Sequence, residues 1–119
     1  MLGQLENWTF IAETTAPKEI LDILISGESI VIAYKTIRDV AVVTNKRIIL
    51  ADKQGITGKK VELYTIPFKS IFMYSSENAG LLDGNSELEL WTKAGKIKLN
   101  LARGVDVRKL DKIIGEYIL

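Results

Sequence analysis

The 119-residue sequence contains no cysteine and no histidine. Without cysteine the chain forms no disulfide and offers no thiolate, which is compatible with a reducing cytoplasm. Without histidine it lacks the commonest general base and the commonest protein metal ligand. These absences remove most of the side-chain chemistry that hydrolases and zinc enzymes use. We therefore expect no enzymatic activity, no metal site and no cofactor.

Long apolar runs are also missing. The longest stretches, such as residues 30–34 and 40–43, are far shorter than the roughly 18 residues that a membrane span needs. The first ten residues, MLGQLENWTF, carry no positive leader, and polar residues interrupt their apolar ones, so we expect no signal peptide. The length suits one domain with a core that needs no cross-links. We expect a soluble domain located in the cytoplasm.

Charge of one sign does not dominate. The net charge is +1, whereas a nucleic-acid-binding domain is expected to be basic overall, so we expect no nucleic-acid partner. The charges are unevenly placed, because residues 1–34 carry five acids against one base, and residues 35–69 carry eight bases against three acids. The acidic head and the basic middle could attract each other within one chain or between copies.

Seven short segments rich in β-branched and aromatic residues follow one another after residue 28, separated by turn sequences such as TNK and KAG. They cover residues 29–35, 39–44, 47–53, 59–66, 69–75, 86–92 and 96–101. This spacing predicts a barrel or sandwich whose neighbouring strands are mostly antiparallel. After these segments Asp106 can cap a final helix. Its apolar face would consist of Val107, Leu110, Ile113, Ile114 and Tyr117.

The N-terminal part of the chain shows a different pattern. Apolar residues recur at near-helical spacing from Leu2 to Ile11, and Pro17 suits the first turn of a short helix that ends at Gly27. We therefore expect an N-terminal helical extension over residues 1–27 and a β-rich domain over residues 28–119.

The alternation in the last two segments assigns a register to a hairpin. A tip at residues 94–95 pairs Leu90 with Leu99 and Trp91 with Lys98. The apolar rows of both strands then share one face, and Trp91 lies on the outer, charged face. There Trp91 either lies over its own surface against Lys98 in a cation–π contact or anchors a contact between subunits.

Three of the predicted strands are apolar on both faces; in the first, Ile30 and Ile32 face one way while Val31 and Ala33 face the other. Such strands must be covered by a helix, a loop or another chain. We expect a homo-oligomer whose interface uses outward residues of these strands and of the last hairpin. The candidate interface residues are Val31, Ala33, Phe72, Tyr74, Trp91 and Lys98.

The segment VVTNKRIIL places Asn45, Lys46 and Arg47 between two apolar runs. One explanation is a ligand site in which the two cations bind a phosphate. The other is turn chemistry, because asparagine tolerates the positive φ angles of tight turns and a hairpin tip is exposed to water. Turn chemistry is sufficient to explain the sequence. A ligand site would require other cations to converge on this tip.

Two further motifs match known sites only in part. The stretch QGITGKK, residues 54–60, has the glycines and the lysine of a phosphate loop, but the spacing is wrong and a strand follows. Asp83, Asn85 and Glu87 resemble the start of a calcium loop, but Leu88 stands where that loop requires glycine. We expect neither segment to bind its ligand.

One long segment resembles the signature of the bacterial pleckstrin-homology domain family: YKTIRDVAVVTNKRIILADKQGITGKKVELYTIPFKSI, residues 34–71. The motifs IRD, TNKR, DKQG and GKK arrive in order, and the resemblance extends from Glu28 to the C-terminus. It implies two nearly orthogonal antiparallel sheets with seven strands in all, capped by the C-terminal helix. It also implies ring-like homo-oligomers and no established enzymatic activity.

The superfamily name suggests phosphoinositide binding, but this chain departs from that pattern. Lipid-binding members place a lysine and a Lys/Arg-x-Arg cluster around the loop between the first two strands. Here that loop carries Lys35 and Arg38 beside Asp39. We expect a non-catalytic interaction module that self-assembles, as a ring, into a binding scaffold, with another protein or peptide as a further candidate partner. The alternative is a peripheral adaptor that binds anionic lipid headgroups. Its candidate ligand-binding residues are Lys35, Arg38, Lys46, Arg47, Lys59 and Lys60.

Overall fold

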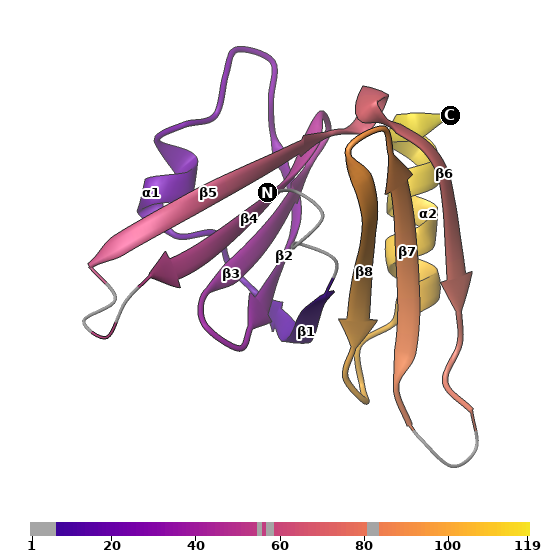
Figure 1. Cartoon of the computed structure of the whole chain (residues 1–119). Helices are drawn as coiled ribbons and strands as arrows, with labels where there is room; N and C mark the ends of the chain where they lie inside the picture. The colour runs from indigo at the N-terminus through magenta and orange to yellow at the C-terminus, as the bar shows by residue number, and fades with distance from the viewer. Residues whose placement is uncertain (1–6, 55, 57–58, 81–83) are drawn as a thin grey trace.

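The computed structural model describes residues 7–54, 56, 59–80 and 84–119, and its architecture is mainly β with a long C-terminal helix (Figure 1). The strands are β1 (Asn7–Thr14), β2 (Ile30–Thr36), β3 (Val40–Thr44), β4 (Arg47–Gln54), β5 (Lys60–Pro67), β6 (Ile71–Glu77), β7 (Ser86–Thr92) and β8 (Gly95–Leu101). The helices are α1 (Lys18–Leu21), the 3-10 turn η2 (Phe68–Ser70) and α2 (Val107–Ile118).

The strands form one hydrogen-bonded sheet in the order β5-β4-β3-β2-β1-β8-β7-β6. The predicted mainly β fold with its C-terminal helix is confirmed, and the seven predicted strands correspond to β2–β8. The predicted helical extension over residues 1–27 differs in detail: residues 7–14 form an eighth strand in the middle of the sheet, α1 is the predicted short helix after Pro17, and residues 1–6 lie outside the described residues. β1 pairs antiparallel with β2 and parallel with β8, so the sheet is not wholly antiparallel.

β1 joins two halves of the sheet, β2–β5 and β6–β8, whose strands run in different directions in Figure 1. Both halves turn one apolar face toward a shared core that includes Phe10, Tyr34, Leu50 and Leu99. α2 closes this core by packing on β6, β7 and η2. Its buried residues are Val107, Leu110 and Ile114, three of the five predicted for the apolar face.

α2 begins where the sequence predicted. The Asp106 carboxylate accepts hydrogen bonds from the backbone N–H groups of Arg108 and Lys109, at 3.0 and 3.2 Å. These two groups belong to the first helical turn and have no partner within the helix. The side chain of Asp106 therefore stabilises the helix start in the manner of an N-cap residue.

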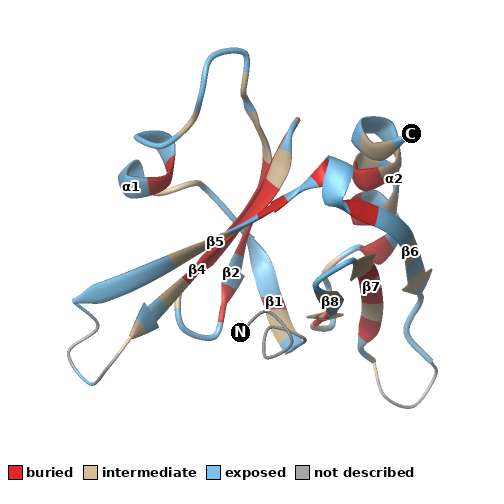
Figure 2. Ribbon diagram, turned by 45° about the horizontal axis from the view of Figure 1, so that its top comes forward, coloured by how far each residue is buried: buried red, intermediate tan, exposed pale blue. Residues whose placement is uncertain are grey.

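The second face of β2, β3 and β4 is covered by the chain's own N-terminal segment. Ile20 of α1 is fully buried in one cluster with Ala33, Val42 and Ile49. Figure 2 shows a buried segment within α1. β2 and β3, two of the three strands predicted to be apolar on both faces, thus find their cover within the chain. α1 itself is shorter than predicted, since it ends at Leu21 rather than near Gly27.

The β7–β8 hairpin has the predicted face but not the predicted register. Leu90 pairs with Ile97 and Trp91 with Lys96, a shift of two positions along β8. The closing pair is Thr92 and Gly95, so the two-residue tip is Lys93–Ala94 rather than residues 94–95. Side chains alternate with a period of two along a strand, so a two-residue shift leaves the apolar rows on the same face.

Candidate functional site

The β3–β4 turn, where sequence analysis left a ligand site open, is held by its own side chains. The Thr44 hydroxyl accepts hydrogen bonds from the backbone N–H groups of Lys46 and Arg47, both at 3.0 Å. The Asn45 side chain accepts from the Ser29 backbone N–H at 2.9 Å and donates to the Gly27 carbonyl at 3.0 Å. Among the described residues, positive φ angles occur only at glycines. Asn45 therefore ties this turn to residues 27–29 and does not adopt the positive φ that asparagine tolerates.

Arg47 is engaged in an internal ion pair. Its guanidinium donates to both oxygens of the Glu28 carboxylate, at 2.8 and 2.9 Å, and also to the Ile23 carbonyl at 3.0 Å. The Thr44 hydroxyl donates to the same carboxylate at 2.6 Å. The Glu28 side chain is 0% exposed and that of Arg47 is 16% exposed. Arg47 is thus the counter-ion of a buried acid, and its charge is not available to an external phosphate.

This contact holds Glu28 in its ionised form. The hydrogen bonds from Arg47, followed by the one from Thr44, lower the pKa of Glu28 from 4.5 to about 2 against the opposing effect of burial. Charge-assisted, two-pronged contacts of this kind are among the stronger hydrogen bonds in proteins. The acidic head and the basic middle of the sequence therefore meet within one chain at this pair.

The six candidate headgroup-binding cations do not form one site. Lys46 and Arg47 lie at the β3–β4 turn, next to Pro67, with which Arg47 pairs across β4 and β5. The other four, Lys35, Arg38, Lys59 and Lys60, lie at the opposite ends of the same strands, around the β2–β3 and β4–β5 connections. The length of the sheet separates the two groups.

The end that carries four of these cations also carries exposed isoleucines. Ile37 in the β2–β3 loop is 74% exposed, and Ile56 between β4 and β5 is fully exposed. Carboxylates lie close to these cations along the chain and the sheet, since Asp39 follows Arg38 and Asp52 pairs with Glu62 across β4 and β5. This end therefore combines apolar tips with mixed charge.

The candidate interface residues are placed very differently from one another. Ala33 is 2% exposed beneath Ile20, so its side chain cannot reach a second chain in this fold. Val31 is half-buried, and Tyr74 packs against the shared core. Lys98 does not lie against Trp91 as predicted, because it pairs with Glu87 at 3.1 Å.

One patch of exposed apolar side chains remains on β6, an edge strand of the sheet. A bulge at the start of β6 sets Phe72 and Met73 opposite the single residue Trp91 of β7. Phe72 is 68% exposed and Met73 49% exposed, and Trp91 is half-buried with the Lys96 amine 5.8 Å from its ring centroid. We call these three residues the β6 patch. Sequence analysis found Phe72 and Trp91 but missed Met73, whose exposure depends on the bulge.

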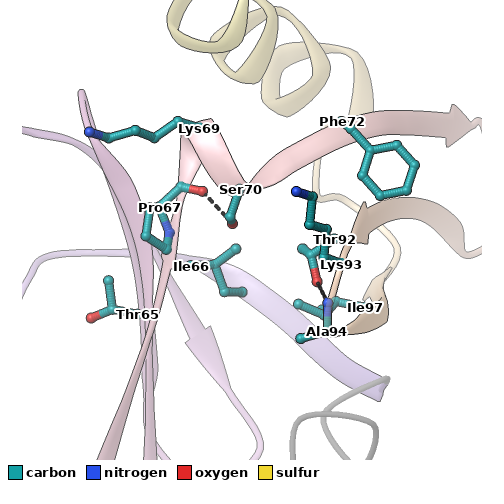
Figure 3. A pocket seen from close by; sticks show the side chains of 10 residues that line it. All are labelled: Thr65, Ile66, Pro67, Lys69, Ser70, Phe72, Thr92, Lys93, Ala94 and Ile97. Atoms are coloured by element: carbon teal, nitrogen blue, oxygen red, sulfur yellow. Dashed lines mark hydrogen bonds between the residues drawn. The ribbon is translucent and has the colours of Figure 1, made fainter.

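A second feature, which sequence analysis missed, lies at the corner where η2 connects β5 to β6. One groove of about 480 Å³ runs between β5, η2 and the β7–β8 turn, and a second of about 640 Å³ runs between the β3–β4 turn, η2 and the end of α2. Both include Pro67 and Lys69, so they meet at η2. We call them the corner grooves. Figure 3 shows the residues that line the first groove. The proline that ends a strand at Pro67 was the available sequence signal.

Two other features are absent from the described ranges. No helix within them is long and apolar enough to cross a membrane. Within the same residues no group of three or more acidic side chains is placed to hold a metal ion.

The family model of the bacterial PH domain matches residues 1–118, almost the whole chain. The chain belongs to the bacterial PH domain family. Among its relatives, the uncharacterized YjqA of Bacillus subtilis (strain 168) is 44% identical over 95 residues, covering 80% of this chain and 76% of YjqA.

Solved PH domains confirm the fold. A DUF1696-family protein with a pleckstrin-homology domain from Shewanella loihica PV-4 is 38% identical, with a TM-score of 0.81 and coverage of 96% of this chain and 99% of the other. A PH domain from Shewanella amazonensis SB2B is 43% identical, with a TM-score of 0.68 and coverage of 86% and 84%. The PH fold typically serves as an interaction module without catalysis. The candidate interaction surfaces of this PH domain are thus the β6 patch, the corner grooves and the end of the sheet that carries Ile37 and Ile56, which we call the Ile37 end.

Proposed function

We propose that this PH domain is a non-catalytic interaction module that assembles with copies of itself, as a ring, into a binding scaffold. The observation that carries the proposal is the β6 patch, because it places exposed Phe72 and Met73 on the edge strand of a sheet. Exposed apolar side chains that gather on one surface commonly mark a contact with another protein. A free strand edge also offers unpaired backbone groups to a second chain.

The sheet ends in two different edge strands, β5 and β6. A contact between unlike surfaces of successive copies is heterologous, and it builds a closed ring when the rotation between copies closes. A stable interface buries about 800 Å² on each partner, which is more than three side chains supply. The interface therefore extends along β6 beyond the patch, with the aromatic residues as its centre.

Trp91 is the residue that distinguishes assembly from a purely local role. If Trp91 only supports its own surface, its contact with Lys96 is worth about 0.5–1 kcal/mol and its loss leaves the assembly size unchanged. If Trp91 anchors the interface, its truncation costs about 2 kcal/mol or more of association free energy. The charges of Lys96, Glu89, Lys98 and Glu87 on the same face would then contribute to the specificity of the contact.

The test is light scattering on the purified chain at tens of micromolar. We expect a homo-oligomer for the wild type, and smaller assemblies for Trp91→Ala and Phe72→Ser with unchanged far-UV circular dichroism. Ile37→Ser is the matched control, because Ile37 is as exposed as Phe72 but lies at the other end of the sheet. A monodisperse wild-type monomer would sink the proposal. If the Trp91→Ala protein keeps the wild-type assembly size, Trp91 supports only the surface of its own chain.

A second candidate function is supported by the Ile37 end. Exposed isoleucines at loop tips can enter the interfacial region of a bilayer, while neighbouring cations attract anionic lipid at about 1 kcal/mol each. In this candidate function the chain is a peripheral membrane adaptor whose lipid-binding cations are Lys35, Arg38, Lys59 and Lys60. Lys46 lies at the opposite end of the sheet and would take part only if the membrane reached that end. Sedimentation with phosphatidylserine vesicles tests it. Loss of binding in an Ile37→Ser protein would support the adaptor, and no binding of the wild type at low salt would remove it.

A further inference from the structure

We propose that the corner grooves bind a segment of a partner protein in which acidic and apolar residues alternate. The proposal rests on the proposed function because it names a partner for the binding scaffold, but its surface shares only Phe72, among the described residues, with the β6 patch that carries self-assembly. The volumes of the two grooves, about 480 and 640 Å³, fall in the range of protein ligand sites. Three of the described lining residues were already candidate site residues in the sequence analysis. Phe72 lies in the first groove, and Lys46 and Arg47 lie in the second.

The corner is held in place by contacts within the chain. Phe68 is buried and its ring stacks on Tyr117 of α2, with the ring centroids 6.2 Å apart. The Phe68 backbone N–H donates to the Lys46 carbonyl at 3.0 Å, which connects η2 to the β3–β4 turn. The Ser70 hydroxyl donates to the Pro67 carbonyl at 2.7 Å (Figure 3). A partner therefore meets a surface that is ordered before it binds, which lowers the entropic cost of association.

The charge of the corner is positive and is not compensated within the described part of the chain. Lys46, Lys69 and Lys93 line the grooves, are exposed, and form no ion pair with a described carboxylate. No described lining residue of either groove is acidic. Four lysines elsewhere do have carboxylate partners: Lys18 pairs with Asp22, Lys96 with Glu89, Lys98 with Glu87, and Lys109 with Glu13. The corner is thus complementary to an anionic partner.

The grooves also have apolar walls, and this narrows the chemistry of the partner. Ile66, Ile97 and Phe72 line one groove, and Ile25 and Tyr117 line the other (Figure 3 shows the first). A free phosphate would leave these apolar walls unused. A segment that alternates acidic and apolar residues would satisfy both features, since its carboxylates reach the lysines while its apolar side chains enter the grooves.

The hollow shape favours a peptide over a membrane surface. Lys69 lies on η2 between the two grooves, and Lys46 and Lys93 come from turns on either side of it (Figure 1 shows the connections). An extended peptide can follow grooves that meet at a corner, whereas a bilayer presents a broad surface. Two strongly exposed apolar residues, Ile37 and Ile56, lie at the other end of the sheet.

The experiment measures fluorescence anisotropy of a labelled peptide in which aspartate and glutamate alternate with leucine and phenylalanine. A control peptide of the same sequence carries asparagine and glutamine in place of aspartate and glutamate. We expect the acidic peptide to bind and the amide peptide to bind at least about tenfold more weakly. Affinity should fall between about 50 and about 300 mM salt, because exposed charges are screened over this range.

Variants then locate the binding on the protein. Lys69→Glu should weaken the acidic peptide at least about tenfold, and Lys93→Glu should weaken it in the same direction. Lys35→Glu is the matched control, since it makes the same charge change on an exposed lysine at the other end of the sheet. Because all three lysines are exposed, we expect the variants to keep the wild-type circular dichroism. Equal binding of the two peptides, or an equal effect of Lys35→Glu, would overturn the proposal.

Two further measurements distinguish peptide binding from self-assembly and from the binding of other anions. Peptide binding by the Trp91→Ala protein should equal that of the wild type, so failure of self-assembly and failure of peptide binding are distinguished. Phosphatidylserine vesicles and inorganic phosphate serve as competitors. If vesicles displace the peptide and bind in a manner that depends on Lys69, the corner is a membrane surface and the peptide proposal is wrong. If phosphate alone displaces it at low concentration, the corner is an anion site and the proposal is equally wrong.

Discussion

Removing the Arg47 guanidinium should destabilise the fold by about 3 kcal/mol. In Arg47→Met the apolar stem is retained, but the Glu28 carboxylate, 0% exposed, loses its counter-ion. The pKa of that carboxyl falls from 4.5 to about 2 in the folded chain, which corresponds to roughly 3 kcal/mol at about 1.4 kcal/mol per pKa unit. Breaking a buried pair by removing one partner typically costs about 3–5 kcal/mol, so the two arguments agree.

The sign of the pH dependence follows from the lowered pKa. Because the folded pKa lies below the ordinary value, the contribution is fully present above about pH 5 and is lost as the pH falls toward 2. Urea denaturation followed by tryptophan fluorescence should therefore show wild-type stability declining over this window. In Arg47→Met the decline should be much smaller, since most of the contribution is already absent at neutral pH.

The neighbouring Lys46→Met is the matched control and should change stability by no more than about 0.5 kcal/mol. The double variant Glu28→Gln/Arg47→Met should be more stable than the sum of the single effects predicts, because no buried charge is left unpaired. If Arg47→Met costs less than about 1 kcal/mol at neutral pH, the ion pair does not stabilise the fold as its geometry indicates.

Three more perturbations test other parts of the fold. Asp106→Ala should cost about 1 kcal/mol by urea denaturation, because two N–H groups of α2 lose their acceptor, and Asp106→Asn should retain most of the stability. Ile20→Ala should cost about 2–5 kcal/mol and increase binding of an apolar dye, because it opens the cover over β2–β4; an unchanged urea midpoint would contradict that role. Tyr34→Phe should be neutral or slightly stabilising, because the buried Tyr34 hydroxyl has no hydrogen-bond partner among the described residues and burial raises its pKa. A loss above about 1 kcal/mol in that variant would reveal a partner for the hydroxyl.

The strands that sequence analysis identified are those whose pattern is local. β2–β8 each combine β-branched or aromatic residues with flanking turn residues, and both signals lie within a few positions. β1 was missed because its apolar residues follow helical spacing and its parallel partner β8 lies near the other end of the chain. The register of the last hairpin was missed for a related reason. Alternation fixes only the face of a strand, and the Thr92 side chain, which accepts from Ala94 and donates to Gly95 at the tip, selects the two-residue turn.

The candidate sites depended on contacts that a linear pattern does not contain. Nothing local to Arg47 indicates that Glu28 neutralises it, and nothing local to Ala33 indicates that Ile20 covers it. The split of the six cations into two groups follows from strand direction, which becomes clear only once the sheet is assembled. Phe72 and Trp91 were identifiable because aromatic residues on a charged face stand out in the sequence. The corner grooves were not, because they combine residues from five separate segments.

The central position of β1 has a consequence for how the chain acquires its fold during synthesis. β1 leaves the ribosome before the other described strands, whereas one of its two neighbours, β8, is the last of the described strands to emerge. Until β8 emerges, β1 can pair only with β2, and the edge of β1 that later receives β8 stays open. Pairings between distant segments form slowly, and open strand edges invite association with other chains. We therefore expect folding intermediates to be most prone to aggregation just before β8 emerges.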